Sequence, residues 1–167
     1  MILFLDFDGV LHPRKESGRD FEQVPRLARW LTVWPGVDVV VSSSWREVHR
    51  QAELVEMVGP VVGARVIGCT PLLTVERLLG RQGWTRAPNP RGRERQQEVL
   101  AWVKASWQPR RPWVVLDDMP DLFEPGCAQL VVCEGETGLT DENLVQLDEH
   151  ARRAGLVPRM VDSGRTA

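Results

Sequence analysis

Two carboxylates at the end of the first apolar run are the clearest candidates for chemistry. Asp6 and Asp8 follow the run Ile2–Leu5 and precede Gly9. In an extended chain, residues two apart point to the same side, so these side chains repel each other unless a cation neutralises them. Oxygen ligands of high charge suit Mg²⁺. The alternative is a turn in which the same aspartates only cap backbone groups.

A second apolar run, Trp113–Leu116, also ends in carboxylates, here Asp117, Asp118 and Asp121. Taken alone, this strand end is explained equally well by a solvated acidic turn. Two such ends in one parallel sheet would place up to five carboxylates near a common edge, which would repel itself strongly without a metal. We therefore expect a Mg²⁺ site at this edge.

Hydroxyl groups follow a third apolar run, Val39–Val41. Ser44 and Glu47 match a capping box, so we expect Ser44 to cap a helix and Ser43 to be freer to bind a ligand. The backbone N–H groups and dipole of that helix start favour an anion such as phosphate. Simple capping by all the serines of this stretch is the alternative.

Basic residues precede or open a predicted helix at about residues 93–106: Arg86, Arg91, Arg93 and Arg95. A positioned cation here would offset the charge of a phosphoryl group and of the acidic cluster. A solvated basic face is the alternative for any one of these arginines.

Short apolar runs rich in Val, Ile and Leu predict the strands that position these groups: Ile2–Leu5, Val37–Val41, Ala64–Ile67, Trp113–Leu116 and Leu130–Val132. Helical patterns lie between them, from about residue 25 to 34, 44 to 58, 93 to 106 and 141 to 154. This alternation predicts an α/β fold with a doubly wound parallel sheet of about five strands. Ligands of such folds bind at the carboxyl ends of the strands.

The composition fits one globular domain. The chain has 167 residues, 43% hydrophobic and 26% charged, with a formal net charge of −2. This balance argues against a strongly basic nucleic-acid binder, although a local basic patch remains compatible with it. Three cysteines without metal spacing indicate a reducing compartment, and no signal or membrane segment is evident. We expect a cytoplasmic protein that does not bind membranes, with a domain over 1–157 and a flexible tail over 158–167.

In their order along the chain, these signals resemble the haloacid dehalogenase (HAD) superfamily of phosphotransferases and phosphohydrolases. Its four motifs match Leu3–Asp8, Val39–Ser43, Arg95 and Val114–Asp118. A finer likeness is to small, nearly capless HAD domains, some of which are fused to RNA-repair proteins. The segments that carry it are Ser-Ser-Trp-Arg after the second strand, Arg95-x-x-Glu98-Val99-x-x-Trp102, and Gly138-Leu139-Thr140.

The resemblance implies a role for each matching residue. Asp6 would be the nucleophile that forms an aspartyl-phosphate, and Asp8 the general acid and base, with its carbonyl also a metal ligand. Ser43 would hydrogen-bond the phosphoryl group, helped by the amides of Phe7 and Ser44.

The same resemblance implies the metal ligands and the cation. Asp118 aligns with the direct Mg²⁺ ligand, and Asp117 and Asp121 with partners that act through water. The superfamily more often has lysine at its third motif. Here we favour Arg95, with Arg93 as the second choice, and a planar guanidinium must act there with different geometry.

The substrate is predicted less sharply than the chemistry. About 27 residues from Leu11 to Asp38 leave no room for a large cap, and 70–92 could form a lid, a substrate loop or a short insertion. An open site suits a phosphorylated macromolecular end, such as a nucleic-acid terminal phosphate. Trp45 and Trp84 are candidates for base stacking. A basic rim could consist of Arg14, Lys15, Arg19, Arg86, Arg91 and Arg93.

Two other classes remain open. A receiver-type signalling domain also uses strand-end aspartates, a hydroxyl, a cation and Mg²⁺, but no DxDG sequence opens such a chain. A catalytically silent HAD-like binding domain is the other alternative, and the arginine at the third motif keeps it open. The oligomeric state does not follow from the sequence.

Overall fold

A parallel five-stranded sheet forms the centre of the protein. The computed structural model describes residues 1–14, 20–73, 93–108 and 110–160. The strands are β1 (Ile2–Leu5), β2 (Asp38–Val41), β3 (Val66–Cys69), β4 (Trp113–Asp117) and β5 (Leu130–Val132). They pair in the order β3-β2-β1-β4-β5, every pair parallel. The predicted doubly wound α/β fold is confirmed.

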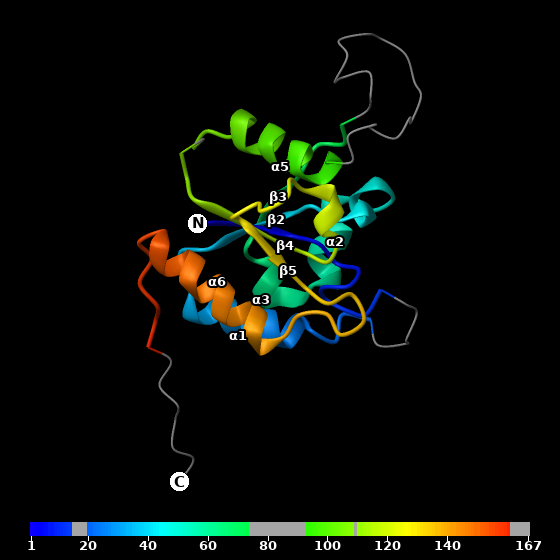
Figure 1. Ribbon diagram of the computed structural model, residues 1–167. Coiled ribbons are helices and arrows are strands. Elements are labelled where there is room, and N and C mark those ends of the chain that lie inside the picture. Colours follow the sequence, from blue (N-terminus) through cyan, green and yellow to red (C-terminus); the bar gives the residue numbers. More distant parts are fainter. Residues whose placement is uncertain (15–19, 74–92, 109, 161–167) are drawn as a thin grey trace, which may run out of the picture.

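Helices cover both faces of this sheet, so the fold has three layers (Figure 1). They are α1 (Val24–Val33), α2 (Gln51–Met57), α3 (Gly59–Gly63), α5 (Glu94–Ala105) and α6 (Asp141–Arg153). Two short 3-10 turns, η1 (Ser44–Glu47) and η2 (Pro120–Leu122), follow β2 and β4. Helix α5 lies on one face, and α1, α3 and α6 lie on the other (Figure 1).

Alternating side chains of each strand divide the core between the two faces. Leu3 and Leu5 belong to the larger apolar cluster, which includes residues of α1 and α6. Ile2 and Phe4 belong to a second cluster, where the Phe4 ring meets Trp102 of α5 edge to face at 5.6 Å. Because side chains alternate along a strand, the residue that follows Leu5 returns to the α5 side.

Polar contacts fix α6 on its face of the sheet. The indole N–H groups of Trp30 and Trp34 both donate to Asp148, at 2.8 and 2.7 Å. The Asn143 side chain donates to the Val132 carbonyl at 2.9 Å, which ties the start of α6 to β5. Both tryptophans are buried and belong to the larger apolar cluster.

Two predicted elements differ clearly from those observed. Strand β3 starts two residues later than predicted, because Ala64 and Arg65 donate to the carbonyls of Pro60 and Val62 and so end α3 instead. The single helix predicted after Ser44 is three pieces, η1, α2 and α3.

The capping box that begins α2 uses different residues from those predicted. Glu53, not Glu47, accepts from the backbone N–H of Arg50, at 2.7 Å. Ser43, not Ser44, caps η1, and its hydroxyl accepts from the Trp45 amide at 3.4 Å.

Several sequence predictions fall on residues 15–19, 74–92 and 161–167, which lie outside the described residues. They include most of the proposed lid and tail, and Lys15, Arg19, Trp84, Arg86 and Arg91. Within the described part of the chain, no helix combines the length and apolarity needed to cross a bilayer.

Candidate active site

Strand alternation and helix α5 bring two carboxylates and one cation together. Asp6 follows Phe4 by two positions and Asp117 follows Val115 by two, so both aspartates point to the α5 face. Arg95 in the first turn of α5 meets them there. Its Nη1 lies 2.6 Å from Asp6 Oδ2 and 2.8 Å from Asp117 Oδ2. The predicted third-motif arginine thus bridges the ends of β1 and β4.

Asp118 completes a group of three buried carboxylates with Asp6 and Asp117. One oxygen from each residue lies within 4.8 Å of the other two. This all-oxygen donor set, buried beside a cavity, is what Mg²⁺ prefers. The residues present fit the metal that the sequence predicts, with Asp6 and Asp118 as the cavity-lining ligands.

Burial makes two of these carboxylates, Asp117 and Asp118, resist ionisation. Burial and repulsion from Asp6 raise the pKa of Asp117 to about 7. Burial also raises the pKa of Asp118, although Arg14 opposes the shift. A divalent cation would remove this penalty, because an opposite charge favours the ionised form.

Arg95 supplies permanent positive charge at this edge. Burial lowers its pKa, but the attraction of Asp6 and Asp117 outweighs burial, so the pKa lies above its ordinary value. Arg95 is 9% exposed and lines the same cavity as Asp6. It can therefore stabilise negative charge on a bound group as well as on the carboxylates.

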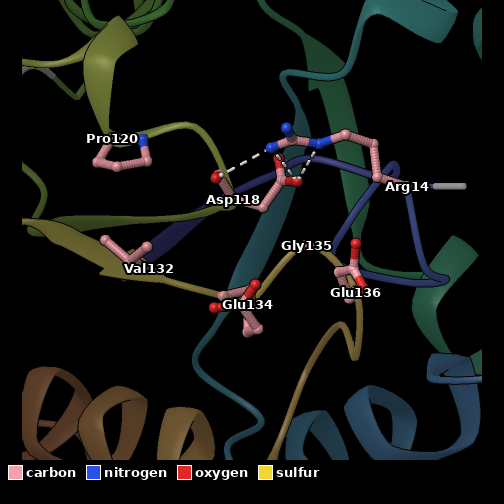
Figure 2. A pocket seen from close by; sticks show the side chains of 8 residues that line it. Arg14, Asp118, Pro120, Val132, Glu134, Gly135 and Glu136 are labelled. Carbon is pink, nitrogen blue, oxygen red and sulfur yellow. Dashed lines mark hydrogen bonds and ion pairs between the residues drawn. The ribbon is translucent and has the colours of Figure 1, made fainter.

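Two glycines and one arginine lie close around the Asp118 side chain. A Cβ on Gly9, which has φ +68°, would lie 1.8 Å from Asp118 Oδ2, and one on Gly135 would lie 2.6 Å from it. Arg14 donates from Nε to the same oxygen at 2.8 Å and from Nη2 to the Asp118 carbonyl at 3.2 Å. Figure 2 shows these two side chains facing each other at one side of a cavity of about 440 Å³.

A larger cavity of about 750 Å³ collects most of the predicted site residues. Its lining includes Asp6, Asp8, Ser44, Trp45, Arg95 and Asp118. Asp8 does not join the three-carboxylate group, because the chain turns after β1 with Val10 and Leu11 both donating to the Phe7 carbonyl. Asp6 and Asp8 nevertheless line the same cavity.

The serines after β2 are arranged differently from the prediction. Ser43 is fully buried as the cap of η1, whereas Ser44 is exposed and lines the cavity. The prediction that Ser44 is the cap and that Ser43 is the freer hydroxyl is wrong, because Ser43 is the cap. Phe7, whose amide donates to Asp6 Oδ1 at 2.8 Å, is buried below the site.

Two predicted residues lie apart from this cavity. Asp121 is exposed on η2 and lies outside the three-carboxylate group. Arg93 makes an ion pair with Glu124 at 2.7 Å, with both side chains well exposed. Neither belongs to the cavity lining.

An ion pair between Arg46 and Glu98 holds the end of β2 against α5. Arg46 donates to the carbonyls of Ser42 at 2.7 Å, Ser43 at 2.5 Å and Thr70 at 3.2 Å, and it also pairs with Glu98. The matching sequence segments contain both residues, but their spacing alone did not indicate this contact. Because Glu98 lies one helical turn after Arg95, the pair also helps to place Arg95.

This all-parallel α/β fold with a strand-end acidic group and a bridging arginine defines a HAD-type, phosphohydrolase-like domain. Residues 2–144 match the family described as the HAD domain in Swiss Army Knife RNA repair proteins. The chain belongs to this family, which confirms the resemblance predicted from its motifs. No curated protein and no solved structure matches the chain.

Proposed function

We propose that this domain is a Mg²⁺-dependent phosphomonoester hydrolase that acts through an aspartyl-phosphate on Asp6. One observation carries the proposal: Asp6 lines a cavity together with Asp8, Arg95 and Asp118, and Arg95 Nη1 forms an ion pair with Asp6 Oδ2 at 2.6 Å. The family membership supports the same chemistry.

In the first step, an Asp6 carboxylate oxygen attacks phosphorus as the bond to the leaving oxygen breaks. Asp8 gives that oxygen a proton. In the second step, Asp8 takes a proton from a water that attacks phosphorus. The bond between phosphorus and Asp6 then breaks, releasing inorganic phosphate and restoring the Asp6 carboxylate.

The other groups of the site bind charge and the phosphoryl oxygens. Arg95 offsets the negative charge that gathers at Asp6. The Ser44 amide and the Ser43 hydroxyl, which as the cap of η1 only accepts, are proposed donors to the phosphoryl group, whereas the Phe7 amide already donates to Asp6. Asp6, Asp118 and the Asp8 carbonyl would hold Mg²⁺, with Asp117 as an outer partner. The bound ion would supply charge neutralisation of the phosphoryl oxygens.

We further propose that the substrate is a phosphorylated nucleic-acid end. The RNA-repair description of the family favours this class, and Trp45 on the cavity offers an aromatic face for a terminal base. Arg93 would act at the outer part of this surface.

Phosphate release from p-nitrophenyl phosphate and from 3′- and 5′-phosphorylated oligonucleotides tests both parts. We expect release with Mg²⁺ that stops on chelation and in Asp6→Asn. A stable aspartyl-phosphate without turnover would instead identify a receiver-type domain. Neither phosphorylation nor release would identify a silent binding domain. Release from p-nitrophenyl phosphate alone would refute only the nucleic-acid substrate.

A further inference from the structure

Both oxygens of the Asp8 carboxylate face ring N–H groups. Trp45 Nε1 donates to Asp8 Oδ2 at 2.9 Å, and His12 Nε2 lies 3.0 Å from Asp8 Oδ1. The Asp8 side chain is 40% exposed and lines the large cavity, whereas the His12 side chain is 7% exposed. The Asp8 carboxylate therefore lies at the cavity wall and is held there by hydrogen bonds to the buried His12 ring and the half-buried Trp45 ring.

The backbone of Phe21 determines which His12 nitrogen carries the proton. The Phe21 amide donates to His12 Nδ1 at 3.4 Å, and an amide N–H can only donate. In the neutral ring Nδ1 is then the acceptor, so the proton lies on Nε2 and points at Asp8. Phe21 has φ +58°, the only positive φ of a residue other than glycine among the described residues. Strained backbone of this kind tends to occur at functional sites.

Ring packing fixes both donors in place. The His12 ring lies 5.0 Å from Phe21 and 5.8 Å from Trp45, measured between centroids, and Phe21 lies 5.5 Å from Trp45. Phe7 packs below Trp45 at 6.1 Å. These ring contacts hold both donors against Asp8, because rotation of either ring would lose packing with its neighbours.

We propose that His12 and Trp45 are positioning residues that aim Asp8 for proton transfer, an inference that rests on the proposed function. Each carboxylate oxygen has two lone pairs. One lone pair on each oxygen accepts a ring N–H. The second lone pair stays free, and on one of the two oxygens it carries the proton that passes to the leaving oxygen. Fixing the carboxyl group in this orientation lowers the entropy lost on reaching the transition state.

The test compares leaving groups, since a purely structural role would affect all substrates alike. Trp45→Phe keeps an aromatic ring but removes the N–H donor with the five-membered part of the indole, and His12→Leu removes the other donor. His12→Gln restores an N–H near the position of Nε2. Trp30→Phe is the matched control, because it also removes an indole donor to an aspartate, at 2.8 Å from Asp148, but on α1.

The measured quantity is kcat/KM, which reports the first irreversible step, for p-nitrophenyl phosphate and for an alkyl phosphomonoester. General acid catalysis contributes roughly 10²–10⁴-fold where the leaving group needs a proton. We expect Trp45→Phe and His12→Leu to lower kcat/KM by about tenfold or more for the alkyl ester and by less than about threefold for p-nitrophenyl phosphate. His12→Gln should recover part of the loss, and Trp30→Phe should match the wild type.

Two outcomes would overturn the inference. Equal losses on both substrates would show that the two rings only support the fold, and no loss would show that Asp8 needs neither. If His12→Leu fails to fold, Trp45→Phe decides between these results. The proposed function itself would be overturned if the wild-type protein had no Mg²⁺-dependent activity, or if Asp6→Asn left that activity unchanged.

Discussion

The Arg46–Glu98 ion pair offers the sharpest test of how the site is held together. Its side chains are only 5% and 11% exposed. Burial lowers the pKa of Arg46 and raises that of Glu98, in each case against the attraction of the partner. Water therefore stabilises neither charge, and removing one charge leaves the other buried and unpaired. Glu98→Gln keeps the shape of the side chain and removes only its charge.

The expected cost follows from this burial. Breaking a buried pair by removing one partner costs roughly 3–5 kcal/mol. The glutamine oxygen still accepts one hydrogen bond from Arg46, so we expect the lower end, about 3 kcal/mol. For a chain of this length, that lowers Tm by about 6–12 °C. Because α5 also carries Arg95, we expect kcat/KM to fall as well, at temperatures where the variant is fully folded.

The Arg153–Glu149 pair on α6 is the matched control. Its charged atoms are 2.8 Å apart, but its side chains are 71% and 54% exposed. Glu149→Gln should cost less than about 0.5 kcal/mol, because solvent screens an exposed helical pair. Urea denaturation of both variants measures the two free energies of unfolding. Equal, small losses for Glu98→Gln and Glu149→Gln would refute the view that the buried pair holds α5 against the sheet.

Three further predictions concern the acidic group. Gly9→Ala should abolish activity and destabilise the fold more than Gly126→Ala. Both residues have positive φ, but of these two only a Cβ at Gly9 would collide with Asp118. Equal losses of unfolding free energy in urea denaturation would contradict this close packing around Asp118. In metal-free protein, the raised pKa of Asp117 means that the folded state keeps a proton which the unfolded state releases. The free energy of unfolding should therefore fall as pH rises from about 4 to 7. Denaturation at several pH values should show that Asp117→Asn lacks this part of the fall. The same dependence on pH in the wild type and in Asp117→Asn would be evidence against this role of Asp117. Millimolar Mg²⁺ should raise Tm in the wild type but not in Asp118→Asn, as followed by circular dichroism; an equal rise in both would place the ion elsewhere.

Most of the architecture could be predicted because buried parallel strands have a plain sequence signature. The runs at Ile2–Leu5 and Leu130–Val132 match the observed strands at both ends. The errors arise where side chains compete for backbone groups. After Ser44 the helix is interrupted at Arg50, whose backbone is extended (φ −73°, ψ 154°) and whose N–H donates to the Glu53 side chain, and again at Gly59, which has φ +71°.

The candidate site could be predicted only where strand ends determine it. Alternation along β1 and β4 explains why Asp6 and Asp117 meet, and the spacing within α5 singles out Arg95. The partners of Asp8 come from a loop and from η1, so no periodicity points to His12. Arg14 contacts Asp118 from more than 100 residues away in the chain, and such a contact has no local signal.

The central claim is that the Asp6 carboxylate attacks phosphorus, and rapid acid quench with a ³²P-labelled phosphomonoester and Mg²⁺ tests it most directly. We predict one acid-stable, hydroxylamine-sensitive label per chain, located on the peptide that contains Asp6 and absent from Asp6→Asn. Release of labelled phosphate with no protein-bound label at any quench time, and at an unchanged rate in Asp6→Asn, would contradict the account.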